Sequence, residues 1–335
     1  MQDPKFRKSK IDLFSTRFTN RFKFFKNGFG DTEFLKEIPD LIRKDSFETI
    51  PDLEWKKART IGGVLWKYGV FKSPFSPYLP ESVQTAHIQM ISPKNLEKDT
   101  PICIHFAMTG DQGFYMRLFS MALPLVKDGI ASVILEIPYY GLRKPKSQFN
   151  IFVNTVSDFF KMCGGTISEG ISLLEYFKKE GYTNLGVSGV SMGGNISCFV
   201  TSLYKDQIAS VPCLPPHSPQ PVFVRGLLQE SLHWKKLSQQ ANGLDAAREK
   251  MDTLMDSVSL LNFPIPISKK NAIIVAGDAD AIVPPQSVQE LHKHWQGSEL
   301  RWVSGGHVRS IFGKTGIFRQ AIRDSFVKLR ENKSS

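Results

Sequence analysis

The sequence lacks any run of 18 apolar residues, and no apolar core of the signal-peptide kind lies near its start. The first absence excludes a helix that spans a bilayer, and the second gives no indication of a secretory signal peptide. Cysteine is scarce, and the four cysteines lack the spacing of metal ligands. Because they lie mostly in apolar stretches, we expect the reduced core residues of an intracellular protein at Cys103, Cys163, Cys198 and Cys213.

Acidic residues are fewer than basic residues. The chain of 335 residues has 43 Lys and Arg against 32 Asp and Glu, which gives a net charge of +11. Residues 1–30 hold eight basic and two acidic residues and so supply +6 of this charge. A basic surface favours anionic partners. Because no nucleic-acid-binding module is present, we expect an acidic lipid surface and no nucleic acid.

Residues 1–58 are expected to form a basic amphipathic N-terminal segment. Within it, apolar residues recur at spacings of three and four and predict one face of a helix, namely Ile11, Phe14, Phe18, Phe22 and Phe25. Such a helix is suited to peripheral membrane contact through residues 5–26, or to a mitochondrial presequence. The alternative is a helix that packs its Phe residues onto the domain.

The chemistry is expected at Gly189-Val190-Ser191-Met192-Gly193. An apolar strand pattern at residues 184–188 precedes this motif, and a helix pattern begins at residue 194. Strand, G-x-S-x-G and helix form the nucleophile elbow of α/β-hydrolases, in which a sharp turn exposes a serine hydroxyl. Glycine is needed there because the chain passes too close for a Cβ. We therefore predict Ser191 as a nucleophile.

An aspartate and a histidine follow in the order that this fold requires. Asp280 comes after an apolar strand pattern at residues 271–276, and His307 comes after another at residues 300–303. His307 is predicted to act as general base and then acid, while Asp280 orients and stabilises its imidazole. Asp278 is the alternative to Asp280. No metal or organic cofactor is expected.

These motifs predict an α/β-hydrolase fold with a mostly parallel central sheet flanked by helices. The core is expected to comprise residues 59–213 and 271–331, with a small helical cap or lid at residues 214–270. The oxyanion hole is expected to use two backbone N–H groups. One belongs to Met192, and the other to Thr109 as first choice or to Met108 as second.

The loop at residues 138–145 follows a strand pattern at the same edge of the predicted sheet. It combines two aromatic and two basic residues and predicts a wall for an anionic head group, with substrate-binding residues Tyr139, Tyr140, Arg143 and Lys144. The alternative is a solvated turn with packed tyrosines.

Beyond these motifs, the chain resembles the alpha/beta-hydrolase domain-containing protein 18 family over roughly residues 60–330. The matching pieces are Cys103-Ile104-His105, Thr109-Gly110-Asp111, Pro138-Tyr139-Tyr140-Gly141-x-Arg143-Lys144-Pro145, Gly189-x-Ser191-Met192-Gly193-Gly194, Asp280-Ala281-x-Val283-Pro284, Gly305-Gly306-His307 and Gly316-Ile317-Phe318-Arg319-Gln320-Ala321-Ile322. The resemblance implies an intracellular, mitochondria-linked serine hydrolase that deacylates phospholipids, cardiolipin in particular. One position departs from the family pattern, since Met108 stands where glycine is expected. If that position requires a positive φ, the oxyanion hole is built differently or is impaired.

Three functions remain open at this point. The first is hydrolysis of a carboxylic ester of an anionic lipid through an acyl-enzyme at Ser191. The second is an esterase or thioesterase that acts on a small soluble substrate. The third is a non-catalytic protein of hydrolase fold that binds lipid or a partner.

Overall fold

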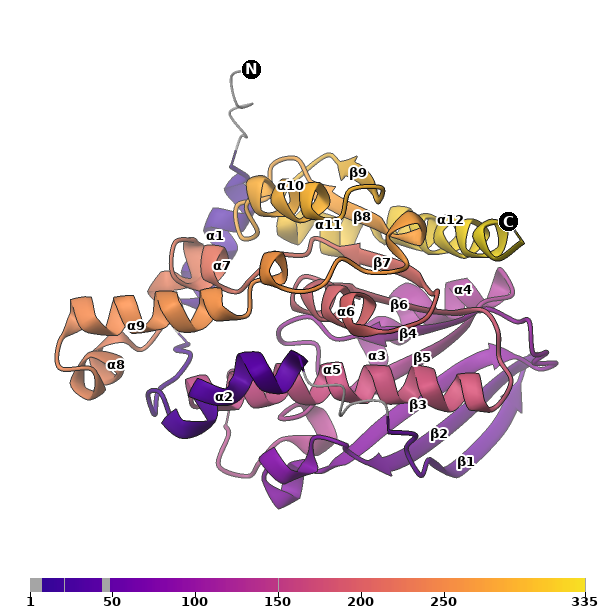
Figure 1. The fold of residues 1–335 in the computed structure, drawn as a ribbon, viewed down its shortest axis with the longest axis horizontal. Coiled ribbons are helices and arrows are strands. Elements are labelled where there is room, and N and C mark those ends of the chain that lie inside the picture. Colours follow the sequence, from indigo (N-terminus) through magenta and orange to yellow (C-terminus); the bar gives the residue numbers. More distant parts are fainter. Residues whose placement is uncertain (1–7, 21, 44–48, 150, 335) are drawn as a thin grey trace.

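A nine-stranded sheet with helices on both faces forms the body of the protein (Figure 1). The computed structural model describes residues 8–20, 22–43, 49–149 and 151–334. The strands are β1 Glu54–Ile61, β2 Val64–Lys72, β3 Thr85–Pro93, β4 Ile102–Phe106, β5 Ala131–Glu136, β6 Leu185–Val190, β7 Ala209–Cys213, β8 Ile273–Gly277 and β9 Glu299–Val303.

The strand order is β1-β2-β3-β5-β4-β6-β7-β8-β9. The first three strands form an antiparallel meander that pairs antiparallel with β5, and all later pairs are parallel. The strands from β4 to β8 are buried apolar runs, as expected for a sheet covered on both faces. Their carboxyl ends lie at one edge, which is where open α/β sheets hold ligands.

The helices cover both faces of the sheet. They are α1 Lys10–Thr19, α2 Thr32–Arg43, α3 Tyr115–Arg117, α4 Leu123–Lys127, α5 Val156–Lys179, α6 Met192–Leu203, α7 Gln220–Phe223, α8 Trp234–Gln240, α9 Leu244–Ser257, α10 Pro285–His294, α11 His307–Gly313 and α12 Thr315–Ser334. One face carries α5, α6 and α10, and the other carries α3, α4 and α12. None of the helices in the described ranges is long and apolar enough to cross a membrane.

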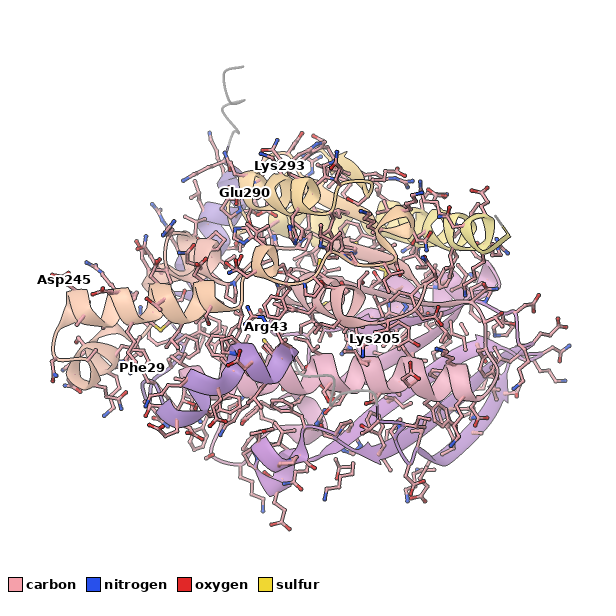
Figure 2. The ribbon with its side chains drawn as sticks, in the orientation of Figure 1. Phe29, Arg43, Lys205, Asp245, Glu290 and Lys293 are labelled. Atoms are coloured by element: carbon pink, nitrogen blue, oxygen red, sulfur yellow. The ribbon has the colours of Figure 1, made fainter. Side chains whose placement is uncertain are left out.

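The expected cap is a helical insertion between β7 and β8 that contains α7, α8 and α9. Helices α8 and α9 project from the body beside the segment that joins α1 to α2 (Figure 1). That segment is tied to the insertion by the N–H of Phe29, which donates to Gln240 Oε1 at 2.8 Å, and by packing of Phe24 against Phe223. Figure 2 labels Phe29 near one end of α2 and Arg43 at the other.

The N-terminal segment is not one long amphipathic helix. Helix α1 ends at Thr19, so Phe22 and Phe25 lie beyond it, and Phe25 is fully buried in the core. Helix α2 packs its apolar face on α5. The core also begins before the expected boundary at residue 59. Strand β1 starts at Glu54, and its mostly exposed polar residues explain why no strand was predicted there.

The cysteines are free thiols. Three are buried and Cys163 is partly buried, as expected for residues of the core.

Candidate active site

The turn between β6 and α6 holds Ser191 in a strained backbone conformation. Its φ of 57° and ψ of −117° place it outside the regions that L residues prefer. The Ser191 N–H donates to the carbonyl of Cys213 on the neighbouring strand at 2.9 Å. A Cβ at Gly189 would lie 2.2 Å from the Gly193 carbonyl oxygen, and one at Gly193 would lie 2.4 Å from that of Phe106. Both glycines are therefore required by close backbone approach.

The structure brings Ser191, His307 and Asp280 together. Ser191 Oγ lies 2.9 Å from His307 Nε2, and His307 Nδ1 lies 2.6 Å from Asp280 Oδ2. The imidazole and the carboxylate are buried, whereas Ser191 is partly accessible. Asp278 instead accepts the N–H of Gly305 at 2.8 Å, on the surface. The geometry therefore favours Asp280 over Asp278 as the partner of the histidine.

The surroundings of His307 favour its charged form. Burial alone lowers the pKa of the imidazole, but the charge and hydrogen bond of Asp280 and the charge of Asp12 outweigh this effect. The net result is a pKa above the ordinary value of 6.5. The imidazolium that forms when a serine gives up its proton is thus stabilised.

Two backbone N–H groups lie free beside the serine. Among the residues that the structure describes, no carbonyl or side chain accepts a hydrogen bond from the N–H of Met192 or of Thr109. Met192 is the first residue of α6, and both residues line the same cavity as Ser191. Both groups were predicted for the oxyanion hole, which needs unpaired donors beside the nucleophile.

Met108 is accommodated without strain. It has no positive φ, and the left-handed residues of this loop are Gly110, at φ 89°, and Gly113, at φ 74°. The Gly110 N–H donates to the Tyr140 hydroxyl at 3.1 Å, so this buried tyrosine holds the loop that carries Thr109. The departure from the family pattern therefore leaves the loop intact.

A cavity of about 340 Å³ opens at Ser191 and His307. Its walls are mainly aromatic and aliphatic side chains from the insertion, from the β8–α10 loop and from α11. No Asp, Glu, Lys or Arg is among the described residues that line it. The apolar lining residues include Phe24, Phe152, Phe159, Val222, Phe223, Leu228, Ile282 and Ile311.

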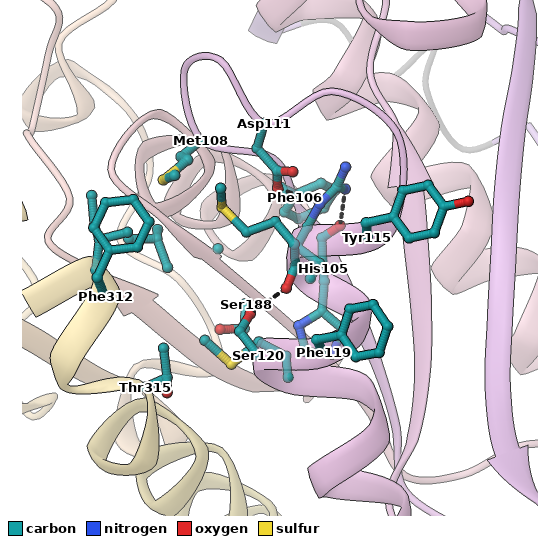
Figure 3. A pocket seen from close by; sticks show the side chains of 16 residues that line it. His105, Phe106, Met108, Asp111, Tyr115, Phe119, Ser120, Ser188, Phe312 and Thr315 are labelled. Carbon is teal, nitrogen blue, oxygen red and sulfur yellow. Dashed lines mark hydrogen bonds and ion pairs between the residues drawn. The ribbon is translucent and has the colours of Figure 1, made fainter.

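A second cavity of about 490 Å³ lies behind the elbow, beside Ser188 and Gly189 (Figure 3). Phe312 faces Tyr115 and Phe119 across it, and neither Ser191 nor His307 lines it. Met108, Ile311 and Phe312 border both cavities.

The predicted head-group wall is wrong for three of its four residues. Arg143 is buried and makes a two-pronged ion pair with Glu169, with N–O distances of 2.7 and 2.8 Å. Tyr139 and Tyr140 are also buried, and none of the three lines the cavity at Ser191. Lys144 is exposed and also lies outside this cavity. Arg143 and the two tyrosines therefore belong to the core, and the alternative of packed tyrosines holds for Tyr139 and Tyr140.

Asp12 is the site residue that the sequence analysis missed. Its carboxylate is fully buried and accepts N–H groups from Ala281, His307 and Val308 at 2.8–3.0 Å. The sequence feature that could have revealed it is a single acidic residue, Asp12, within a predicted helix that is otherwise basic and rich in Phe.

Comparison with known proteins agrees with this architecture. An acetyl xylan esterase from Paenibacillus sp. R4 is 12% identical, with a TM-score of 0.59 over 90% of this chain and 97% of that chain. Acetyl xylan esterase 1 from Thermoanaerobacterium sp. JW/SL YS485 is 15% identical, with a TM-score of 0.56 over 93% and 98%. These likenesses show the α/β-hydrolase fold. The family described as alpha/beta hydrolase domain containing 18 matches residues 22–244 and 238–328. The chain belongs to this family.

Proposed function

We propose that this protein is a serine hydrolase that cleaves carboxylic esters of lipids, in particular an acyl ester of an anionic phospholipid such as cardiolipin. The observation that carries the proposal is the hydrogen-bonded series Ser191, His307 and Asp280 at the end of an apolar cavity. Serine needs an adjacent base to become a nucleophile, and the base needs an orienting partner.

In the proposed reaction, His307 Nε2 takes the proton of Ser191 Oγ as the oxygen attacks the ester carbonyl carbon. The carbonyl oxygen becomes an oxyanion that accepts the N–H groups of Met192 and Thr109. His307 then protonates the departing alcohol, which leaves an acyl group on Ser191. The same imidazole takes a proton from water, whose oxygen attacks the acyl carbon. It then gives that proton to Ser191 Oγ as the bond from Oγ to the acyl carbon breaks and the fatty acid leaves. Asp280 Oδ2 holds Nδ1 of the imidazole throughout.

The cavity lining supports an acyl chain as the buried part of the substrate. The described lining is mainly apolar and includes no Asp, Glu, Lys or Arg, so it stabilises a hydrocarbon chain and offers an ionised head group no counter-charge of these types. An anionic head group would therefore stay outside the cavity while its acyl ester reaches Ser191.

We propose that the exposed part of residues 5–26 meets the lipid surface, since Phe24 and Phe25 are buried. Helix α1 turns the polar Asp12 and Thr16 inward, whereas Ile11 is 52% and Phe14 76% exposed. Lys10 and Arg17 are exposed on the same helix and suit anionic lipid. Residues 5–7 and 21 lie outside the described residues. The membrane-associated or mitochondrial location remains part of this proposal and is testable by imaging the tagged full chain in cells.

Vesicles test the substrate class. Wild type and Ser191→Ala are incubated with cardiolipin or phosphatidylcholine vesicles, and released fatty acid is measured by mass spectrometry. The proposal predicts release by wild type alone, faster from the anionic vesicles. A model-ester series of increasing acyl length is run beside it. Preference for the shortest acyl group with no effect of vesicles would replace the lipid proposal with a soluble esterase.

The membrane contact has a matched test. Ile11→Asp should weaken co-sedimentation with cardiolipin vesicles, because it puts a charge on the proposed contact face. Ile61→Asp, at an equally exposed isoleucine on β1, should leave co-sedimentation unchanged. Equal effects of the two changes would contradict contact through α1.

A further inference from the structure

A carboxylate from the start of the chain lies inside the candidate active site. Asp12 on α1 is fully buried, and its Oδ2 accepts the N–H of His307 at 2.8 Å and that of Ala281 at 3.0 Å. Its Oδ1 accepts the N–H of Val308 at 3.0 Å. One side chain thus joins the loop after β8, which carries Asp280, to the start of α11, which carries His307.

The backbone around Asp12 strengthens this junction. The Ser9 N–H donates to the carbonyl of Ala279, in the same loop as Asp280. A Cβ at Gly306 would lie 2.3 Å from Ser9 Cβ and 2.4 Å from Asp12 Oδ2. Gly306 has an ordinary φ of −85°, so glycine is needed there for space and not for backbone conformation. The glycine before the catalytic histidine is therefore fitted to α1.

We propose that Asp12 is a positioning residue of the catalytic site, which fixes the distance between Asp280 and His307 by binding the backbone of both loops. This inference deepens the proposed hydrolase function and depends on it for its effect on rate. It also makes α1 an integral part of the enzyme, which argues against a presequence that is removed from the active protein.

The charge of Asp12 acts on the same imidazole. Asp280 from the β8–α10 loop and Asp12 from α1 are the charged groups that raise the pKa of His307 against the effect of burial. Ser191 faces the imidazole from the elbow and is neutral. Removal of the Asp12 charge should therefore lower the pKa of His307, whereas loss of a purely structural contact would leave it unchanged.

The test compares wild type with Asp12→Asn, which keeps the side-chain size but removes the charge and one acceptor. Asp245→Asn is the matched control, because Asp245 is an exposed acid near the outer end of α9 (Figure 2). Two quantities are measured on the full chain. One is the rate of labelling by a fluorophosphonate as a function of pH. The other is the pKa of His307, by NMR titration with the resonance assigned through a His307 variant.

We expect Asp12→Asn to label about 10- to 100-fold more slowly at a pH where His307 is neutral, since small misplacements of catalytic groups cost this much. We also expect a lower His307 pKa and a matching downward shift of the acid limb of the labelling profile. Asp245→Asn should match wild type in all of these. A circular dichroism melt confirms that each variant is folded.

An unchanged rate and an unchanged His307 pKa in folded Asp12→Asn would overturn the inference. If Asp12→Asn does not fold, Asp12→Glu, which keeps the charge, is measured by the same titration. A His307 pKa equal to wild type with slower labelling would then support positioning, and wild-type labelling would overturn it. The NMR titration of His307 does not require catalytic activity. A wild type that the probe fails to label would therefore contradict the proposed hydrolase function, whereas the titration would still test the effect of Asp12 on His307.

Discussion

The two carboxylate oxygens of Asp280 bind different groups. Oδ2 lies 2.6 Å from His307 Nδ1, while Oδ1 accepts the N–H groups of Ile282 and Val283 at 2.9 and 2.8 Å. The backbone bonds fix the carboxylate, and the fixed carboxylate then selects one imidazole tautomer. Asp280 was preferred from the sequence because Gly277-x-x-Asp280-x-x-Val283-Pro284 fits the usual turn into the next helix. Asp278 stayed an alternative because it lies in the same short loop, and their hydrogen bonds now separate the two acids.

Asp280→Asn should lower kcat by about 10⁴-fold with a small change in KM, because an amide can hold the imidazole in the wrong tautomer. Asp278→Asn should change kcat by less than about 10-fold, since the exposed Asp278 carboxylate binds the Gly305 N–H and not the His307 imidazole. Kinetics with a soluble model ester measure both. The assignment fails if the two variants lose activity equally.

Arg143 shows how a sequence pattern misleads. A basic residue in a loop at the active-site edge suggested an anion site, but Glu169 from α5 meets it in the interior. No spacing rule connects residues 143 and 169, so the sequence alone did not reveal the pair.

Arg143→Ala should lower the free energy of unfolding by about 3–5 kcal/mol, because it leaves Glu169 buried and unpaired. Lys144→Ala, at the exposed neighbouring position, should change it by less than about 0.5 kcal/mol. Urea denaturation measures both. A head-group role for Arg143 would instead show as weaker vesicle hydrolysis at unchanged stability.

At the scale of elements, the nucleophile elbow was the most predictable part. Its glycines follow from the close passage of β6, α6 and the neighbouring strands, which the motif itself encodes. Helix α1 was the least predictable. Its Phe spacing fits an amphipathic helix, but the helix ends at Thr19 and has Asp12 on its buried side. The spacing of apolar residues predicts which face of a helix is apolar. It does not predict that a helix packs on the domain through a buried polar residue such as Asp12.

Gly194→Ala tests the packing of the elbow. A Cβ there would lie 2.5 Å from the carbonyl oxygen of Cys213, which is backbone and cannot move freely. We expect a loss of about 1–3 kcal/mol in the free energy of unfolding, as for other overpacked cores. Gly313→Ala, where nothing lies within 4 Å, should be near neutral. Equal stability of the two variants would contradict this description of the turn.

At the scale of the whole molecule, the chain order of the motifs was enough to predict that they meet. Parallel strands end at one edge of the sheet, so residues that follow β4, β6, β8 and β9 gather there. The helical insertion was also predictable, from the break in strand pattern after β7. Its contacts with the N-terminal segment were not, because they join residues about 200 positions apart and follow no local pattern.

The pH dependence of global stability offers a further prediction. Burial raises the pKa of Glu136 to about 7, with Asp111 adding to the effect and Arg117 opposing it. Because the folded pKa exceeds the unfolded value near 4.5, the stabilisation is fully present below that value and is lost as pH rises through 7.

Between pH 6 and 8 this single group should lower the free energy of unfolding by about 1 kcal/mol. Glu136→Gln should lack that part of the decline, whereas Glu33→Gln, at an exposed acid, should retain it. Denaturant titrations at the two pH values measure the difference. A decline in Glu136→Gln as large as that of wild type would contradict the prediction.

The central claim is that Ser191 is an activated nucleophile, and fluorophosphonate labelling tests it most directly. Purified wild type and Ser191→Ala are treated with the probe, and intact mass and peptide mapping locate the adduct. We predict one adduct per chain, on Ser191, with none on Ser191→Ala. A folded wild type that stays unlabelled, or an adduct that persists in Ser191→Ala, would contradict the claim.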